Sequence, residues 1–190
     1  MPRQVFDHDS PDRFVAGAVG EPGSRTFFLQ ARTGRRLNSV ALEKQQVSVL
    51  AERIDELLDE VLRRSGGTAP VPAIAPSDSD DNDPLDTPIE EEFRVGTMSL
   101  AWDGETDRVV VECYSEGVSV DEEEEEEQPD PGPQQQEGAV LRVSLSGTAA
   151  RVFAKRALSV VAAGRPPCPF CANPLDAEGH ICPRANGYRR

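Results

Sequence analysis

This sequence lacks long apolar runs, and no stretch of it approaches the roughly 20 residues that a membrane-spanning helix needs. It also lacks an apolar region behind a basic start at residues 1–5, so we expect no secretory signal and a cytoplasmic location. Groups for catalysis are scarce: the chain has two histidines, no phosphate-binding loop and no serine-centred nucleophile elbow. We therefore expect no membrane partner, nominate no catalytic residue, and favour a binding protein over an enzyme.

Cysteine is also rare, but three of the four cysteines gather near the C-terminus beside one of the histidines. Cys168 and Cys171 are separated by two residues, a spacing at which a tight turn brings both thiolates to one ion. Pro169 and Gly179 are residue types that favour the required bends. Four thiolate and imidazole ligands suit one tetrahedral zinc ion with a structural role. The predicted ligands are Cys168, Cys171, His180 and Cys182.

Other interpretations of this cysteine cluster remain open. A Cys-x-x-Cys pair with an internal proline also occurs in thiol redox proteins, although there it opens a helix, whereas the prolines around Cys168 indicate a loop. Disulfides are less favoured, since no secretory signal is present. If His180 is not a ligand, the ion keeps an open position and a reactive zinc becomes possible.

The chain has a formal net charge of −14, but its C-terminal end is basic. Residues 1–150 contain 13 Lys and Arg against 32 Asp and Glu, whereas residues 151–190 contain 7 against 2. We expect the basic end to meet a protein partner or an acidic segment of its own chain; nucleic acid is less favoured, because the acidic body repels phosphate. The candidate recognition residues are Arg184, Asn186, Tyr188, Arg189 and Arg190.

Two segments have the composition of disordered chain. Residues 68–88 are rich in Pro, Ala, Ser and Asp, so they bury too little apolar surface to offset the entropy of ordering. Residues 117–138 include seven consecutive acidic residues, whose charges repel one another. We predict a disordered linker at 68–88 and a disordered acidic insertion at 117–138.

Apolar periodicity predicts the regular elements. A stripe of apolar residues at three- and four-residue steps predicts a helix over 44–64, and a second helix follows Thr148, its expected N-cap, to residue 163 with Gly164 as its stop. A bulge at Gly96 would bring the apolar residues on both sides of it onto one face of their strand. Strands are predicted at 14–19, 26–32, 37–42, 93–102, 108–114 and 140–145, with a short one at Val5 and Phe6.

These elements repeat along the chain. At an offset of 103 residues, Val40 pairs with Val143 and Arg53 with Arg156, and both windows cross from a strand into a helix at the same place. We therefore predict an α+β fold of two β-β-β-α pseudo-repeats, at 1–67 and 89–164, with antiparallel sheets and two helices. Each unit would be marginal alone, so the two should share a core. Residues 165–190 would form a zinc-knuckle-like tail.

Two further residues carry chemistry in principle. His8 stands between two aspartates in a turn-like stretch, and we interpret it as a solvated turn histidine, since no nucleophile is near it in the sequence. Cys113 lies within a predicted strand, where a thiol packs as a small apolar group, so we predict a buried residue rather than a nucleophile.

Three stretches resemble a known family. They are residues 27–31, the segment 42–64, and the tail from Cys168 to Tyr188 with its Cys-Pro-Phe-Cys and Gly-His-Ile-Cys-Pro-Arg motifs. The chain resembles an uncharacterised family of actinobacterial proteins known only as a domain of unknown function. The resemblance covers nearly the whole chain apart from the two insertions, and it implies no activity.

The combined features favour a zinc-binding, non-enzymatic interaction or adaptor protein. A full set of four ligands and the absence of a catalytic motif support that hypothesis. Three alternatives stay open: an enzyme with a site between the two halves, a redox-responsive Cys-x-x-Cys protein, and a nucleic-acid-binding knuckle.

Overall fold

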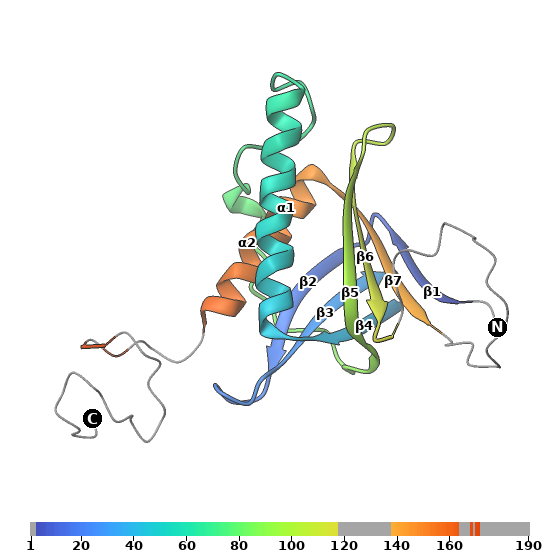
Figure 1. Ribbon diagram of the computed structural model, residues 1–190, viewed down its shortest axis with the longest axis vertical. Helices are drawn as coiled ribbons and strands as arrows, with labels where there is room; N and C mark the ends of the chain where they lie inside the picture. The colour runs from blue at the N-terminus through green and yellow to red at the C-terminus, as the bar shows by residue number, and fades with distance from the viewer. Residues whose placement is uncertain (1–2, 118–137, 164–167, 169, 172–190) are drawn as a thin grey trace, which may run out of the picture.

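The chain forms a curved mixed β-sheet with two helices packed against one of its faces, as the computed structural model in Figure 1 shows. The structure describes residues 3–117, 138–163, 168, 170 and 171. Within these residues the fold is α+β with seven strands and two α-helices, which confirms the predicted class. No helix in the described part of the chain combines the length and the apolar character needed to cross a membrane.

Strand positions follow the predicted ones closely. The strands are β1 (Gln4–Asp9), β2 (Arg13–Val19), β3 (Thr26–Thr33), β4 (Arg36–Leu42), β5 (Glu91–Asp103), β6 (Arg108–Ser115) and β7 (Ala139–Ser146). Their order across the sheet is β1-β7-β6-β5-β4-β3-β2.

One continuous sheet replaces the two antiparallel sheets that we expected. The meanders β2-β3-β4 and β5-β6-β7 are each antiparallel, but β4 pairs with β5 in parallel, and this pair joins the two halves. A second parallel pair places β1 beside β7 at the edge of the sheet. Parallel partners need a long crossover, and α1 with the segment that follows it provides the one between β4 and β5.

Two helices cover the inner face of the sheet. α1 (Lys44–Arg64) begins with a capping box, in which the backbone N–H of Glu43 donates to Oε1 of Gln46 at 2.8 Å, and it ends before Gly66 and Gly67, both at positive φ. α2 (Gly147–Ala162) has Ser146 as its N-cap, with the Ser146 hydroxyl oxygen accepting from the N–H of Ala149, so the predicted cap at Thr148 is wrong. The predicted stop at Gly164 lies outside the described residues.

A single core lies between the helices and the sheet. It combines residues of both halves, including Leu29, Ile54, Val111 and Phe153, each at most 1% exposed. The register of β5 against β6 shifts between Val95 and Thr97, which confirms the predicted bulge at Gly96. The bulge lets the apolar residues on both sides of Gly96 pack against this core.

β1 corrects the interpretation of His8. Instead of a solvated turn, residues 4–9 form a strand, and His8 is fully buried. Its Nδ1 lies 2.8 Å from Oγ1 of Thr33, and its Nε2 lies 2.9 Å from Oδ1 of Asn38. The turn-like composition of the stretch was misleading because the partners of β1 come from distant parts of the chain.

Segment 68–90, which includes the predicted linker at 68–88, makes contacts with the body of the protein. It contains a short 3-10 helix, η1 (Ser77–Ser79), and its side chains and backbone bond to β2, β3 and α2. A few apolar side chains hold it, since Val71 is buried in the core and Leu85 packs over Gly17. Ionic and polar contacts add to these. The predicted acidic insertion falls largely outside the described residues.

Candidate functional site

The predicted metal centre is described at its first two ligands only. Cys168 is buried and Cys171 is half-buried, and residues 170 and 171 form a turn. The backbone N–H of Phe170 donates to Sγ of Cys168 at 3.5 Å. A hydrogen bond to sulfur favours the thiolate, the form in which cysteine binds a metal ion.

The other predicted site residues lie outside the described part of the chain. These are the ligands His180 and Cys182 and the recognition residues Arg184, Asn186, Tyr188, Arg189 and Arg190. Among the residues that the structure does describe, no group of three or more His, Cys, Asp or Glu side chains is placed to hold a metal ion. The Cys3His site and its zinc ion therefore stay predictions.

Cys113 has a different environment from the tail cysteines. It lies in β6 and is 1% exposed, and burial raises the pKa of its thiol to about 12. A thiol that stays protonated is neither a nucleophile nor a metal ligand near neutral pH. The prediction that Cys113 is buried is confirmed, whereas its lack of reactivity stays a prediction.

Two arginines fasten segment 68–90 to the body; we call Arg13, Arg156 and Asp81 the arginine clamp. Arg13 donates from Nε to Oδ2 of Asp81 at 2.6 Å and from Nη2 to Oδ1 at 2.9 Å, a bidentate pair. Arg156 donates from Nη1 to Oδ1 of Asp81 at 2.7 Å and from Nε to the carbonyl of Ala16 at 3.0 Å. The clamp thus joins β2, α2 and the segment at one carboxylate.

The electrostatics of the clamp favour its charged form. Hydrogen bonds from Arg13 lower the pKa of Asp81, and the same contact raises the pKa of Arg13. Burial lowers the pKa of Arg156, but Nη2 of Arg156 also donates to the carbonyl of Asp83 at 2.7 Å. Hydrogen bonds to charged partners in such sites contribute about 1.5–3 kcal/mol each, less where they are exposed.

A buried amide adds to this attachment. Gln30 of β3 is 1% exposed, and its side chain bonds to both backbone groups of Asp86: Oε1 accepts from the N–H at 2.7 Å, and Nε2 donates to the carbonyl at 3.0 Å. The Gln30 amide therefore bonds to the N–H and carbonyl groups of the segment, as the backbone of a neighbouring strand would. These bonds fix the segment over the outer face of the sheet.

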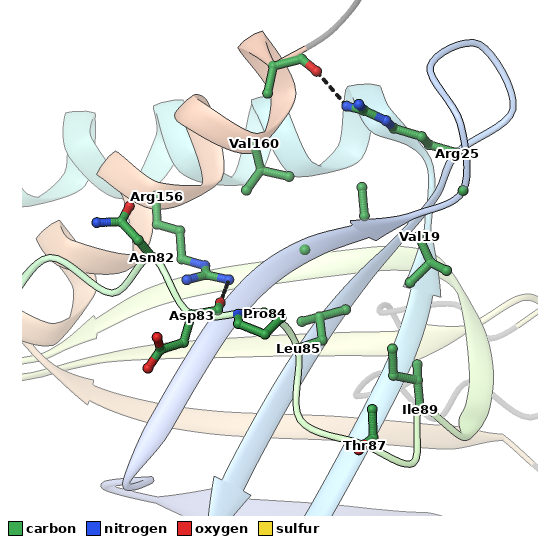
Figure 2. Close-up of a pocket in the computed structure, with 14 residues that line it drawn as sticks. Val19, Arg25, Asn82, Asp83, Pro84, Leu85, Thr87, Ile89, Arg156 and Val160 are labelled. Carbon is green, nitrogen blue, oxygen red and sulfur yellow. Dashed lines mark hydrogen bonds between the residues drawn. The ribbon is translucent and has the colours of Figure 1, made fainter.

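A cavity of about 600 Å³ lies beside the clamp, between β2, the last turns of α2 and residues 82–89 (Figure 2). Its apolar lining includes Val19, Leu85 and Val160. In Figure 2 Arg25 reaches across to the end of α2, where its Nη1 donates to the carbonyl of Ala163 at 2.5 Å, and Arg156 reaches Asp83. The cavity therefore brings together the first half, the segment and the second half.

The chemistry of this cavity suits binding. Its described lining contains two arginines and one carboxylate, that of Asp83, and has no cysteine, histidine or lysine. A nucleophile paired with a general base is thus missing from the described lining. Its volume falls within the roughly 300–1,000 Å³ that is typical of small-ligand sites.

Sequence reasoning did not identify the clamp or the cavity. Arg13 and Arg156 stand more than a hundred residues apart, and Asp81 lies in the segment assigned to a linker. One signal was present: the segment is rich in aspartate, and its carboxylates can pair with arginines of the body.

Comparisons with known proteins agree with the resemblance seen in the sequence. The profile of the family described as "Protein of unknown function (DUF3090)" matches residues 6–182. No curated protein and no solved structure gives a significant match. The expected domain of unknown function is confirmed, while its actinobacterial origin stays a prediction. Because the match spans nearly all of the sequence, the chain belongs to the family described as "Protein of unknown function (DUF3090)".

Proposed function

We propose that this chain is a zinc-binding, non-enzymatic interaction protein. The turn at Cys168–Cys171 carries the proposal, because the N–H of Phe170 donates to the sulfur of Cys168. A backbone N–H that donates to the first sulfur of a Cys-x-x-Cys turn favours the thiolate form of that cysteine, which is the form that binds a metal ion. His180 and Cys182 would complete a set of four, and a full protein shell suits a structural ion.

In this proposal the metal holds the basic tail in shape for a partner. Residues 151–190 carry a surplus of five positive charges, whereas the rest of the chain carries a surplus of nineteen negative charges. A protein partner fits this distribution better than nucleic acid, which the acidic body repels. The residues that would contact the partner are Arg184, Asn186, Tyr188, Arg189 and Arg190.

The metal content of the purified protein tests the proposal. We expect one zinc ion per chain in protein prepared without added metal, and its loss from the Cys168→Ser and Cys171→Ser variants, because serine does not replace a thiolate. Cys113→Ser is the matched control: it is the same substitution at a buried cysteine outside the set and should retain the zinc. The His180→Asn variant tests the histidine ligand.

A different result would support the redox alternative. If no metal is bound, and Cys168 and Cys171 pass reversibly between thiols and a disulfide as the glutathione ratio is varied, the zinc proposal is wrong. Thiol titration of the same samples measures this directly, and Cys113 should stay unreactive throughout because of the raised pKa of its thiol.

The cavity at β2 and α2 favours a second candidate function. It lies between the two halves, where an enzyme of unknown reaction was the alternative hypothesis, and its arginines would suit an anionic small ligand with an apolar part. Thermal unfolding in the presence of small carboxylates and phosphates tests this: an increase in Tm that is lost in Arg25→Gln would favour it.

We also propose that the two halves are repeats of one β-β-β-α unit. The order β2-β3-β4-α1 equals the order β5-β6-β7-α2, and each meander ends directly before its helix. Val40 and Val143, which pair at the offset of 103, are both buried in the last strand of their meander.

A further inference from the structure

A second groove of about 600 Å³ lies far along the chain from the cysteine tail, between α1 and the hairpin that joins β5 to β6. Figure 1 shows this hairpin rising beside the last turns of α1. The groove is lined by residues of α1, of the loop that follows it and of the hairpin: Leu57, Glu60, Val61, Arg64, Ser65, Thr68, Ala69, Pro70, Trp102, Gly104 and Asp107. None of these residues belongs to the predicted metal site.

The floor of the groove is apolar and contains the only tryptophan of the chain. Leu57, Val61 and Trp102 are half-buried, so each keeps part of its apolar surface exposed. The indole N–H of Trp102 has no hydrogen-bond acceptor among the described residues. A partly exposed indole with an unused donor can stack on a flat cation and bond to a peptide carbonyl.

The wall formed by the hairpin is acidic. Residues 103–108 contain three carboxylates and one arginine. Asp103 uses its carboxylate to hold the turn through Thr106, but the carboxylate of Asp107 has no ion pair or hydrogen bond within the described part of the chain. On the opposite wall Glu60 pairs with both Arg63 and Arg64, which leaves that wall with one surplus positive charge. Asp107 is therefore the one carboxylate of the described lining that is left for a cationic group of a ligand.

Backbone geometry supports a role for the Asp107 side chain. Asp107 adopts φ 54°, in the left-handed region where glycine is favoured. Aspartate and asparagine tolerate this conformation better than most residues, so an Asp107→Asn variant keeps the shape of the turn and removes only the charge. This makes a clean test of the carboxylate possible.

We propose that this groove binds a basic peptide segment of a partner protein. An arginine or lysine of that segment would lie against the face of Trp102 with its charge beside Asp107, and a neighbouring apolar side chain would cover Leu57 and Val61. The net charge of −14 draws such a segment towards the molecule. None of the lining residues belongs to the predicted ligand set, so we expect this interaction to occur without a bound metal.

Tryptophan fluorescence gives a direct measurement of binding in the groove, because Trp102 is the only source of tryptophan emission. The probe is a blocked octapeptide, Gly-Ala-Leu-Arg-Lys-Leu-Ala-Gly, and its counterpart has Glu and Asp in place of Arg and Lys. We expect the basic peptide to change the emission of the full chain in a saturable way, more weakly at high salt, and the acidic peptide to leave it unchanged. The Cys171→Ser variant should behave like the wild type.

Two variants locate the binding. Asp107→Asn should raise the Kd of the basic peptide by about fivefold, in line with the loss of one charge-assisted contact. Asp78→Asn, on the exposed η1, removes the same charge away from the groove and should change the Kd less than about twofold. Calorimetry of a folded Trp102→Leu variant should show weaker binding.

Three outcomes would overturn the proposal. One is an emission that does not respond to the basic peptide up to millimolar concentrations. Another is equal binding of the acidic peptide. The third is an equal effect of Asp107→Asn and Asp78→Asn, which would mean that the peptide binds the acidic surface in general and has no site at Trp102.

Discussion

His8 is a buried titratable side chain that joins three strands. It lies in β1 and bonds to Thr33 at the end of β3 and to Asn38 of β4, and Nδ2 of Asn38 in turn donates to Oε1 of Glu92 at 2.7 Å. Burial lowers the pKa of His8 below its usual 6.5, and the bond to Asn38 opposes this only in part. The folded protein therefore holds His8 in its neutral form.

The lowered pKa of His8 predicts a loss of stability in mild acid. As the pH falls below about 6.5, the unfolded chain takes up a proton that the folded chain resists, so the free energy of unfolding decreases until the folded pKa is passed. The slope cannot exceed about 1.4 kcal/mol per pH unit for one group. Urea unfolding between pH 8 and pH 5 measures how the free energy of unfolding depends on pH.

The two histidines of the chain provide the control. His8→Gln should remove the pH dependence in this range and lower the stability at pH 8, because glutamine reproduces the hydrogen bonds of His8 imperfectly. His180→Gln, outside the described residues, should leave the pH dependence in place. An unchanged slope in His8→Gln would show that another group is responsible.

Segment 68–90 is attached through close packing as well as through ions. A Cβ at Gly17 would lie 2.5–2.8 Å from three side-chain atoms of Leu85, closer than carbon atoms approach. We expect Gly17→Ala to displace Leu85, to cost about 1–3 kcal/mol, and to increase thermolysin cleavage of the segment before Leu85 and Ile89. Mass spectrometry of the fragments identifies the cleavage sites.

Gly104→Ala is the matched substitution for this experiment. A Cβ there meets only Nε1 of Trp102 at 3.9 Å, an ordinary contact, so the segment should keep its protection. If Gly17→Ala resists thermolysin as well as Gly104→Ala does, then the packing of Leu85 contributes little, and the polar contacts of the segment, including the arginine clamp, hold it in place.

The elements that could be predicted are those whose signal is local. The helix at 44–64 and the bulge at Gly96 follow from apolar periodicity within a few turns or pleats, and the structure confirms both. The parallel pairs β4–β5 and β1–β7 could not be predicted, because each depends on contacts between residues far apart in the sequence. The cap of α2 at Ser146 was missed by two residues, since adjacent hydroxyl residues offer competing caps.

The candidate sites likewise divide into those with a local sequence signal and those without one. Cys168 and Cys171 were identifiable because a two-residue spacing is itself the signal of a metal turn. The arginine clamp and the groove at Trp102 have no such spacing, because their residues meet only when α1, α2 and the hairpin take their places. Composition also gave no sign of the contacts made at 68–88, where Val71 and Leu85 pack against the body and Arg13 pairs with Asp81.

The two halves of the molecule are joined through buried charge as well as through the core. Arg151 of α2 is 5% exposed; it donates from Nη1 to Oδ1 of Asp55 in α1 at 2.8 Å and from Nε to the carbonyl of Pro72 at 3.1 Å, and it also pairs with Asp59. Removing either half would leave this guanidinium or these carboxylates without partners. We therefore expect the two halves to fold as one unit.

Cooperative unfolding follows from this arrangement. We expect Trp102 emission, which reports on the second half, and hydrogen exchange at β3, which reports on the first, to give the same free energy of unfolding within about 1 kcal/mol. The free energies of unfolding from the two measurements should decrease together in Arg151→Ala. Two separate transitions in urea would instead mean that each β-β-β-α unit is stable alone.

The pairing of β1 with β7 has a consequence for the order in which the protein is made. β1 leaves the ribosome before the other described strands, but its partner strand begins at Ala139, so at about 5–20 residues per second it waits for roughly 7–26 seconds. During that time Phe6 and His8 have no strand beside them, and the nascent chain offers an unpaired edge. Closure of the sheet is thus a late event in synthesis, and nascent chains stalled before β7 should be targets for chaperones that hold exposed strands.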